Sequence, residues 1–144
     1  MAVRPAPSLS EEIASGIVRV RRRLVAEADR RLAERGEGVL AFQVLSALHQ
    51  RGPMAQNELA QHIGQHPTGM SRLLDDLEQV RLVRRTRDRS DRRKILVEAS
   101  ARGRSFVAQG RPLVDAAVEE VLAPLGRAER RTLRDLLWRM LRDA

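Results

Sequence analysis

The spacing of apolar residues predicts that this chain is mainly helical. Over residues 13–32, apolar side chains recur every three or four positions, which places them along one face of a helix. Ser8 followed by Glu11 is typical of a helix start, and Gly36 marks the expected end. A second helix, richer in apolar residues and therefore expected to be largely buried, follows over residues 39–50.

Two shorter apolar patterns come next, over residues 56–64 and 67–77. Gly64 can take the left-handed conformation that ends a helix. Pro67 suits the first turn of the following helix, because its missing N–H needs no partner there. Ala60 is small where that helix must approach. The two segments therefore predict a helix–turn–helix, with a shared core formed by Leu59, Ile63, Met70, Leu73 and Leu77.

A strand–turn–strand pattern follows directly. We expect strands over residues 82–86 and 95–98, joined by a loop over residues 87–93. Two more helices are expected over residues 100–122 and 127–142. The predicted fold class is mainly α with a small β wing.

Basic residues are concentrated in this hairpin. Eight of the 14 residues from Arg81 to Lys94 are basic and two are acidic, so the stretch carries +6 of the net charge of +8. Such a concentration beside a helix–turn–helix is typical of a protein that binds nucleic acid. The chain has one Trp, two Phe and no Tyr, which argues against sites that stack unpaired bases on aromatic rings. The pattern therefore favours double-stranded DNA.

Composition also narrows the function classes. The lack of cysteine excludes thiol redox sensing, disulfides and thiolate metal sites. No nucleophilic-serine, phosphate-loop or zinc-protease motif is present, so we expect no enzymatic activity, no catalytic residue and no cofactor. No apolar run approaches the roughly 20 residues that cross a bilayer. Residues 1–10 lack the apolar core of a secretory signal, and a cytoplasmic protein is expected.

Two other functions stay open on the sequence alone. A metal-responsive regulator could use His62 and His66, but the Gly64–Pro67 turn separates them, and carboxylates from another segment would be needed. A sequence-indifferent architectural DNA-binding protein would carry the same basic hairpin. Competition with bulk nonspecific DNA distinguishes it from a regulator, because a regulator keeps a few sites that the competitor cannot strip.

The order of the expected elements resembles the MarR family of bacterial winged helix-turn-helix transcriptional regulators, over nearly the whole chain. Two segments carry the resemblance. The first runs from Glu58-Leu59-Ala60 through Ser71-Arg72-Leu73-Leu74-Asp75. The second, which is more specific to the family, runs from Leu82-Val83-Arg84-Arg85 through Asp88-Arg89-Ser90-Asp91-Arg92-Arg93-Lys94.

The resemblance implies one domain over residues 1–144 that forms a homodimer. Residues 10–35 and 100–144 would supply a helical dimerisation platform, and residues 39–99 a winged helix-turn-helix lobe. The length of the first helix agrees with this, because so small a chain leaves part of it uncovered. The resemblance further implies sequence-specific binding to a pseudo-palindromic operator by a repressor, which a small, often aromatic or phenolic, ligand releases. The sequence does not identify the residues that bind such an effector.

The second helix of the pair would enter the major groove by its N-terminal end, presenting His66, Pro67, Thr68, Ser71 and Arg72. Arg72 can bind either a guanine edge or a phosphate. Arg92 or Arg93 would enter the minor groove, with Asp91 orienting the guanidinium. The remaining basic residues of the wing would bind the DNA backbone: Arg84, Arg85, Arg87, Arg89 and Lys94.

Two positions depart from the family pattern. Arg81 stands where the family usually has Gly, and a left-handed backbone would strain a residue with a β-carbon, so we expect a remodelled turn. Ala55 stands where Ser or Thr usually caps the first helix of the pair, so that cap should be missing.

Overall fold

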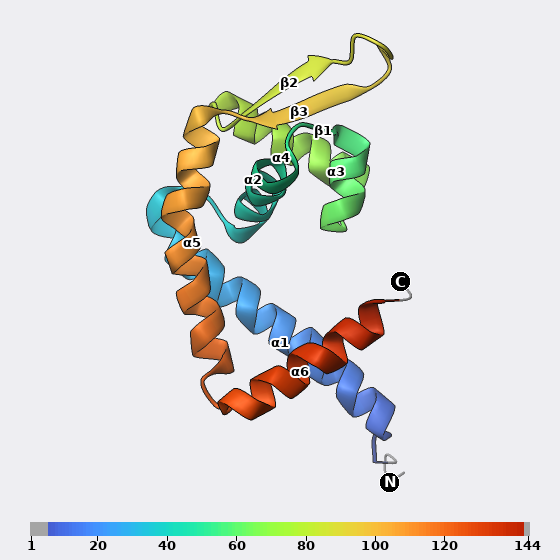
Figure 1. Cartoon of the computed structure of the whole chain (residues 1–144), viewed down its shortest axis with the longest axis vertical. Coiled ribbons are helices and arrows are strands. Elements are labelled where there is room, and N and C mark those ends of the chain that lie inside the picture. The colour runs from blue at the N-terminus through green and yellow to red at the C-terminus, as the bar shows by residue number, and fades with distance from the viewer. Residues whose placement is uncertain (1–5, 143–144) are drawn as a thin grey trace, which may run out of the picture.

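Six α-helices carry a small sheet at one end of the molecule in the computed structural model, which describes residues 6–142 (Figure 1). The undescribed residues include half of the 1–10 segment examined for a secretory signal and the last two of the expected 100–144 platform segment. The elements are α1 (Leu9–Leu32), the 3₁₀ helix η1 (Ala33–Arg35), α2 (Val39–Arg51), β1 (Met54–Ala55), α3 (Gln56–Ile63), α4 (Pro67–Gln79), β2 (Val83–Arg87), β3 (Ile95–Ala99), α5 (Ala101–Leu122) and α6 (Arg127–Leu141). The predicted fold class is confirmed, and the predicted helix bounds agree to within a few residues.

The wing is the antiparallel hairpin of β2 and β3, in which Val83 lies opposite Ala99. Its first strand begins one residue later than predicted. A third strand, β1, was not predicted, and it pairs with the other edge of β3 through Met54 opposite Val97. The sheet order β1-β3-β2 therefore ties the hairpin to the start of α3.

The helix–turn–helix is confirmed as α3 and α4. Gly64 ends α3 with φ 75°, in the left-handed region, and Pro67 is the first residue of α4. Ala55 precedes α3 and provides no side-chain cap, as expected. The short turn therefore takes the geometry that its Gly and Pro favour.

The lobe has one apolar core between α2, α3, α4 and the sheet. The predicted core residues that are fully buried are Leu59, Met70 and Leu77. One assignment was wrong by a single position. Leu74 is the fully buried residue in the middle of α4, whereas Leu73 is only partly buried and packs at the margin of the core, as Ile63 does.

The platform begins with α1, whose start was predicted correctly. The N–H of Glu11 donates to the Ser8 hydroxyl at 3.3 Å, and the N–H of Ser8 donates to the Glu11 carboxylate at 2.7 Å. Hydrogen bonds to the Glu11 carboxylate, first from the Ser8 backbone and then from its side chain, lower the pKa of Glu11 below its ordinary value. The C-terminal part of α1 packs along α5 and buries Ala28 and Leu32.

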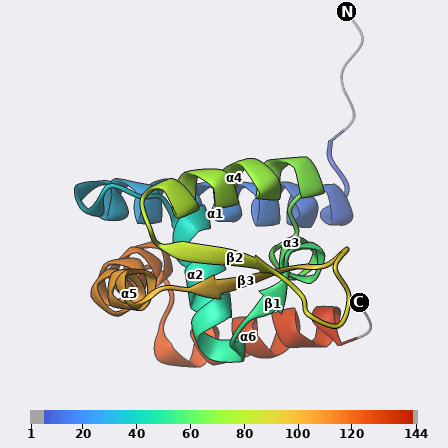
Figure 2. The ribbon, with the colours of Figure 1, turned by 90° about the horizontal axis from the view of Figure 1, so that it is seen from above.

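The rest of the platform leaves apolar side chains uncovered. α1 and α6 overlap in Figure 1, but Figure 2 places them on opposite sides of the molecule. No side chain described in α6 is buried, and Trp138 is 61% exposed. The large apolar residues exposed on these two helices are Leu9, Ile13, Ile17, Val18, Val20, Leu136, Leu137, Trp138, Met140 and Leu141.

A close backbone contact joins the lobe to the platform where α5 begins. The Ser100 N–H donates to the Leu82 carbonyl at 3.0 Å, and the Ser100 hydroxyl donates to the Arg81 carbonyl at 2.6 Å. A β-carbon at Gly103 would lie 2.2 Å from the Leu82 carbonyl oxygen. Glycine is therefore required for α5 to start this close to the wing.

Candidate nucleic-acid interface

The start of α4 presents an exposed polar surface. Pro67, Thr68 and Arg72 are exposed, and Ser71 is partly exposed. His66 caps the helix, because its Nδ1 accepts a hydrogen bond from the Thr68 N–H at 3.2 Å. Thr68 therefore does not cap the helix, and its side chain lies exposed at the helix surface.

The other end of α4 keeps the left-handed turn that Arg81 was expected to disturb. Arg81 has φ 60° and is the one non-glycine residue with a positive φ among residues 6–142. Its N–H donates to the Glu78 carbonyl at 3.0 Å, and the Leu82 N–H donates to the Leu77 carbonyl at 2.8 Å. This pair of bonds is a Schellman motif. The expectation of a remodelled turn is wrong, because the cap bonds and the buried Leu82 hold the backbone in place.

Arg85 joins the wing to α4. Its guanidinium pairs with Asp75 and, at 3.1 Å, with Glu78 on the facing side of α4. Its side chain is only 18% exposed. Burial alone would lower the pKa of Arg85, but the hydrogen bonds to Asp75 and Glu78 raise it on balance. Arg85 was predicted to contact the DNA backbone; in this structure its guanidinium is mostly covered and bonded to two carboxylates of α4.

Two more of the basic residues have partners within the wing. Arg84 on β2 pairs with Glu98 opposite it on β3, with Nε 2.6 Å from the carboxylate. Arg87 donates to the Arg92 carbonyl at 2.9 Å. These contacts strengthen the hairpin. The Glu98 carboxylate offsets the charge of Arg84, whereas Arg87 keeps its charge and has one N–H occupied.

Acidic residues organise the tip of the wing. Asp88 accepts from the Ser90 N–H at 2.9 Å and from the Ser90 hydroxyl at 2.8 Å, and these bonds lower the pKa of Asp88. Asp91 accepts from the Arg93 N–H at 3.1 Å and from Arg93 Nε at 3.2 Å. Between the two candidates for the minor groove, Arg93 is thus the one that Asp91 orients, and its side chain remains 92% exposed.

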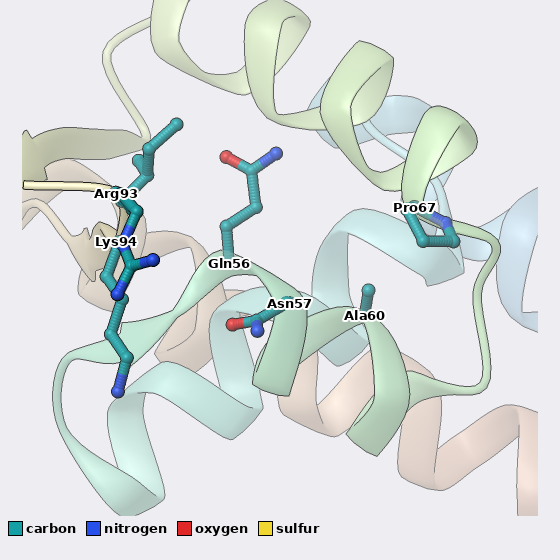
Figure 3. A pocket seen from close by; sticks show the side chains of 7 residues that line it. Gln56, Asn57, Ala60, Pro67, Arg93 and Lys94 are labelled. Atoms are coloured by element: carbon teal, nitrogen blue, oxygen red, sulfur yellow. The ribbon is translucent and has the colours of Figure 1, made fainter.

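A hollow of about 250 Å³ lies between the wing and the helix–turn–helix. Figure 3 shows Arg93 and Lys94 on the wing side, Gln56 and Asn57 on the side of α3, and Pro67 at the start of α4. Gln56 and Asn57 were not predicted as site residues. Their position depends on the pairing of β1 with β3, and the short β1 segment carries no pattern that reveals this pairing.

Comparisons with known proteins support the family resemblance. A model described as MarR family matches residues 38–94, which include α2, the helix–turn–helix and most of the wing. A MarR-family transcriptional regulator from Rhodococcus sp. RHA1 has 26% sequence identity and a TM-score of 0.86, covering 96% of this chain and 99% of that one. Residues 38–94 therefore match the MarR family, and nearly the whole chain is similar to a transcriptional regulator of that family.

Two further solved structures share the fold. One, titled for the regulation of DNA binding of Bordetella bronchiseptica BpsR by 6-hydroxynicotinic acid, has 24% identity and a TM-score of 0.83, covering 90% of this chain and 98% of that one. The other is a mutant of MarR from E. coli complexed with operator DNA, with 24% identity and a TM-score of 0.83, covering 94% of this chain and 99% of that one. No curated protein sequence matches the chain.

Two larger hollows lie where the lobe meets the platform. One, of about 520 Å³, lies between the η1 segment, the end of α4 and α5, and is lined by Arg35, Arg102 and Phe106 among others. The second, of about 570 Å³, lies between α1, α2 and α4. Glu37 lines both, and burial together with the charge of Asp76 raises its pKa.

The two histidines considered for a metal site lie on different segments. His62 belongs to α3, whereas His66 caps α4 and uses its Nδ1 for that purpose. Within residues 6–142, no three His, Cys, Asp or Glu side chains are grouped so that they could hold a metal ion. None of the helices described there is long and apolar enough to span a membrane.

Proposed function

We propose that this protein is a sequence-specific regulator of the MarR type that binds double-stranded operator DNA as a homodimer. The observation that carries the proposal is the arrangement of the wing tip beside the start of α4. An exposed Arg93 held by Asp91 lies next to a helix end whose polar residues face outward. The match to an operator-bound MarR structure from E. coli supports the same mode of binding.

The start of α4 enters the major groove and the wing tip enters the adjacent minor groove. At the start of α4, His66, Thr68, Ser71 and Arg72 face the bases and the flanking phosphates. Arg93 inserts into the minor groove, where a narrow groove attracts a guanidinium. The other exposed basic residues of the wing tip, Arg89, Arg92 and Lys94, bind the DNA backbone. Because each neutralised phosphate releases counterions, affinity should fall steeply as salt rises.

A second copy of the chain covers the exposed faces of α1 and α6. Single apolar residues on a surface are ordinary, but rows of them along two helices mark interaction sites. The two-fold symmetry of such a dimer presents two lobes to major grooves about one helical turn apart. A roughly palindromic operator follows from that symmetry.

The regulator acts as a repressor that a small, aromatic or phenolic ligand releases. The hollows between lobe and platform support this, because a ligand bound there would contact both parts and bias their relative position. The structure of BpsR, titled for control of its DNA binding by 6-hydroxynicotinic acid, is the comparison that favours such control.

Arg93→Ala tests the proposal. Operator fragments are first selected from the source genome with the wild-type protein. The substitution should weaken binding to them by at least about tenfold, or roughly 1.4 kcal/mol, while sedimentation shows an unchanged dimer. Arg127→Ala is the matched control, because it removes the same charge from an exposed position on α6, far from the wing. Equal affinity of wild type and Arg93→Ala for the selected duplex would show that the wing does not contribute to DNA binding through Arg93.

A further inference from the structure

The hollow beside the wing lies between the wing tip and the start of α4. In the proposed function these two parts of the lobe enter different grooves of the DNA. The walls of the hollow are the start of α4, marked by Pro67, and the tip of the wing, marked by Arg93 and Lys94 (Figure 3). The start of α3, with Gln56 and Asn57, forms its floor. In B-DNA the major and minor grooves are separated by the sugar–phosphate backbone of one strand. A lobe that reaches into both grooves must therefore straddle one backbone at this hollow.

We propose that the hollow holds a phosphodiester group of the duplex, bound by Lys94 from the wing and Asn57 from α3. This inference rests on the proposed DNA-binding function and assigns α3 a direct part in it. The contact would fix the depth and orientation of the lobe without reading the base sequence, as backbone contacts do.

The chemistry of the lining fits an anion. None of the described residues that line the hollow is acidic, and two of them are basic. The side-chain oxygen of Asn57 accepts the N–H of Glu58 at 3.0 Å. Its carbonyl oxygen is therefore occupied within the helix start, and its NH₂ group is left to donate to a ligand.

Gln56 is the second residue of the floor with a side-chain amide. The side-chain oxygen Oε1 of Gln56 is buried without a hydrogen bond. Leaving such an atom unpaired is unfavourable, and no hydrogen bond within the protein fixes the oxygen of this carboxamide.

Two hydrogen bonds fix the backbone of Lys94. Its N–H donates to the Asp91 carbonyl at 2.9 Å, and its carbonyl accepts the Asp88 N–H at 3.0 Å. These two bonds close the wing loop on either side of the tip. The Lys94 side chain, which lines the hollow, therefore starts from a fixed backbone position.

Asn57→Asp tests the contact with the least change in shape. It replaces a donor with a negative charge inside the hollow, so we expect affinity for the selected duplex to fall by at least about tenfold. The fold should tolerate it, because an acidic residue in the first turn of a helix is favourable. Gln61→Glu is the matched control, since it adds one negative charge to the same helix at an exposed position outside the hollow. Equal losses in the two variants would mean that net charge alone is responsible and would overturn the inference.

A second experiment locates the phosphate. Single phosphates of the duplex are replaced in turn by neutral methylphosphonates. One replacement per half-site should weaken binding of the wild-type protein and have little further effect on Lys94→Gln. Lys94→Gln should also lower the slope of log affinity against log salt by about 0.9 for each copy in the dimer. If the losses from Lys94→Gln and from every methylphosphonate simply add, Lys94 binds no phosphate. If the wild-type protein binds no duplex at all, the proposed function itself fails.

Discussion

Arg81 shows how one side chain can remain in an unfavourable conformation because its neighbours fix the backbone. The left-handed turn there is required by two cap hydrogen bonds and by the burial of Leu82. A residue with a β-carbon takes this conformation at a cost of roughly 1–2 kcal/mol relative to a right-handed one, whereas Gly takes it freely. The strain at Arg81 is therefore local and can be relieved.

Arg81→Gly should raise the free energy of unfolding by about 1 kcal/mol, because it removes this strain without changing the turn. Chemical denaturation of the purified protein measures the change. Arg81→Ala is the control, since it removes the same charge and keeps the β-carbon. If both variants gain equally, relief of charge repulsion rather than backbone strain is the cause.

At the scale of elements, the wing is attached to α4 as well as to its own partner strand. Arg85 bridges Asp75 and Glu78, which lie one turn apart on α4. Arg84 bridges only the two strands of the hairpin. The Arg85 contacts therefore hold the wing against α4, and the proposed mode of binding requires a fixed angle between them.

Arg85→Met should weaken operator binding severalfold more than Arg84→Met, although both remove one positive charge from neighbouring positions on β2. The cost in stability should stay at or below about 1 kcal/mol, because the carboxylates are largely exposed to solvent. Amide hydrogen exchange should become faster in β2 and β3 for Arg85→Met. Equal effects of the two substitutions on affinity would show that Arg85 acts only through its charge.

The elements of this fold could be predicted because each carries its own periodicity or capping residues. Gly64, Pro67 and the pair of Ser8 with Glu11 gave the correct helix ends. β1 could not be predicted, since a strand of two residues exists only through its pairing with β3. Leu73 and Leu74 were exchanged because both fit a helical spacing, and the direction of packing decides between them.

The candidate site was predicted less completely than the fold. The clustered charge located the wing, and the Asp91–Arg93 contact agrees with the expected orientation of a guanidinium. The number of basic residues overstated the charge available to DNA, because sequence does not show that Arg85 turns inward. Gln56 and Asn57 carry no charge, so composition gave no reason to select them.

At the scale of the whole molecule, the single chain has an incomplete platform. α1 and α6 expose apolar side chains over much of their lengths, and α6 makes few contacts with the rest of the chain. Assembly of two copies would bury these surfaces, and at about 25 cal/mol per Å² of apolar area that burial is the main driving force for association.

Leu137→Glu should convert the protein to a monomer or weaken the dimer by at least about tenfold, because it places a charge in an apolar contact. Analytical ultracentrifugation over a range of concentrations measures the change. Arg131→Glu is the control, an exposed position on the same helix that is already charged. A wild-type protein that sediments as a monomer at all concentrations would contradict the proposed platform.

Trp138 gives the molecule a built-in optical probe. It is the single tryptophan of the chain, and it lies on the apolar face of α6, where its indole is 61% exposed in the isolated chain. Fluorescence from an indole shifts to longer wavelength when water surrounds the ring. Concentrated wild-type protein should thus emit at a shorter wavelength than the Leu137→Glu variant, which would report subunit pairing without an attached dye. Effector titrations could be followed by the same signal.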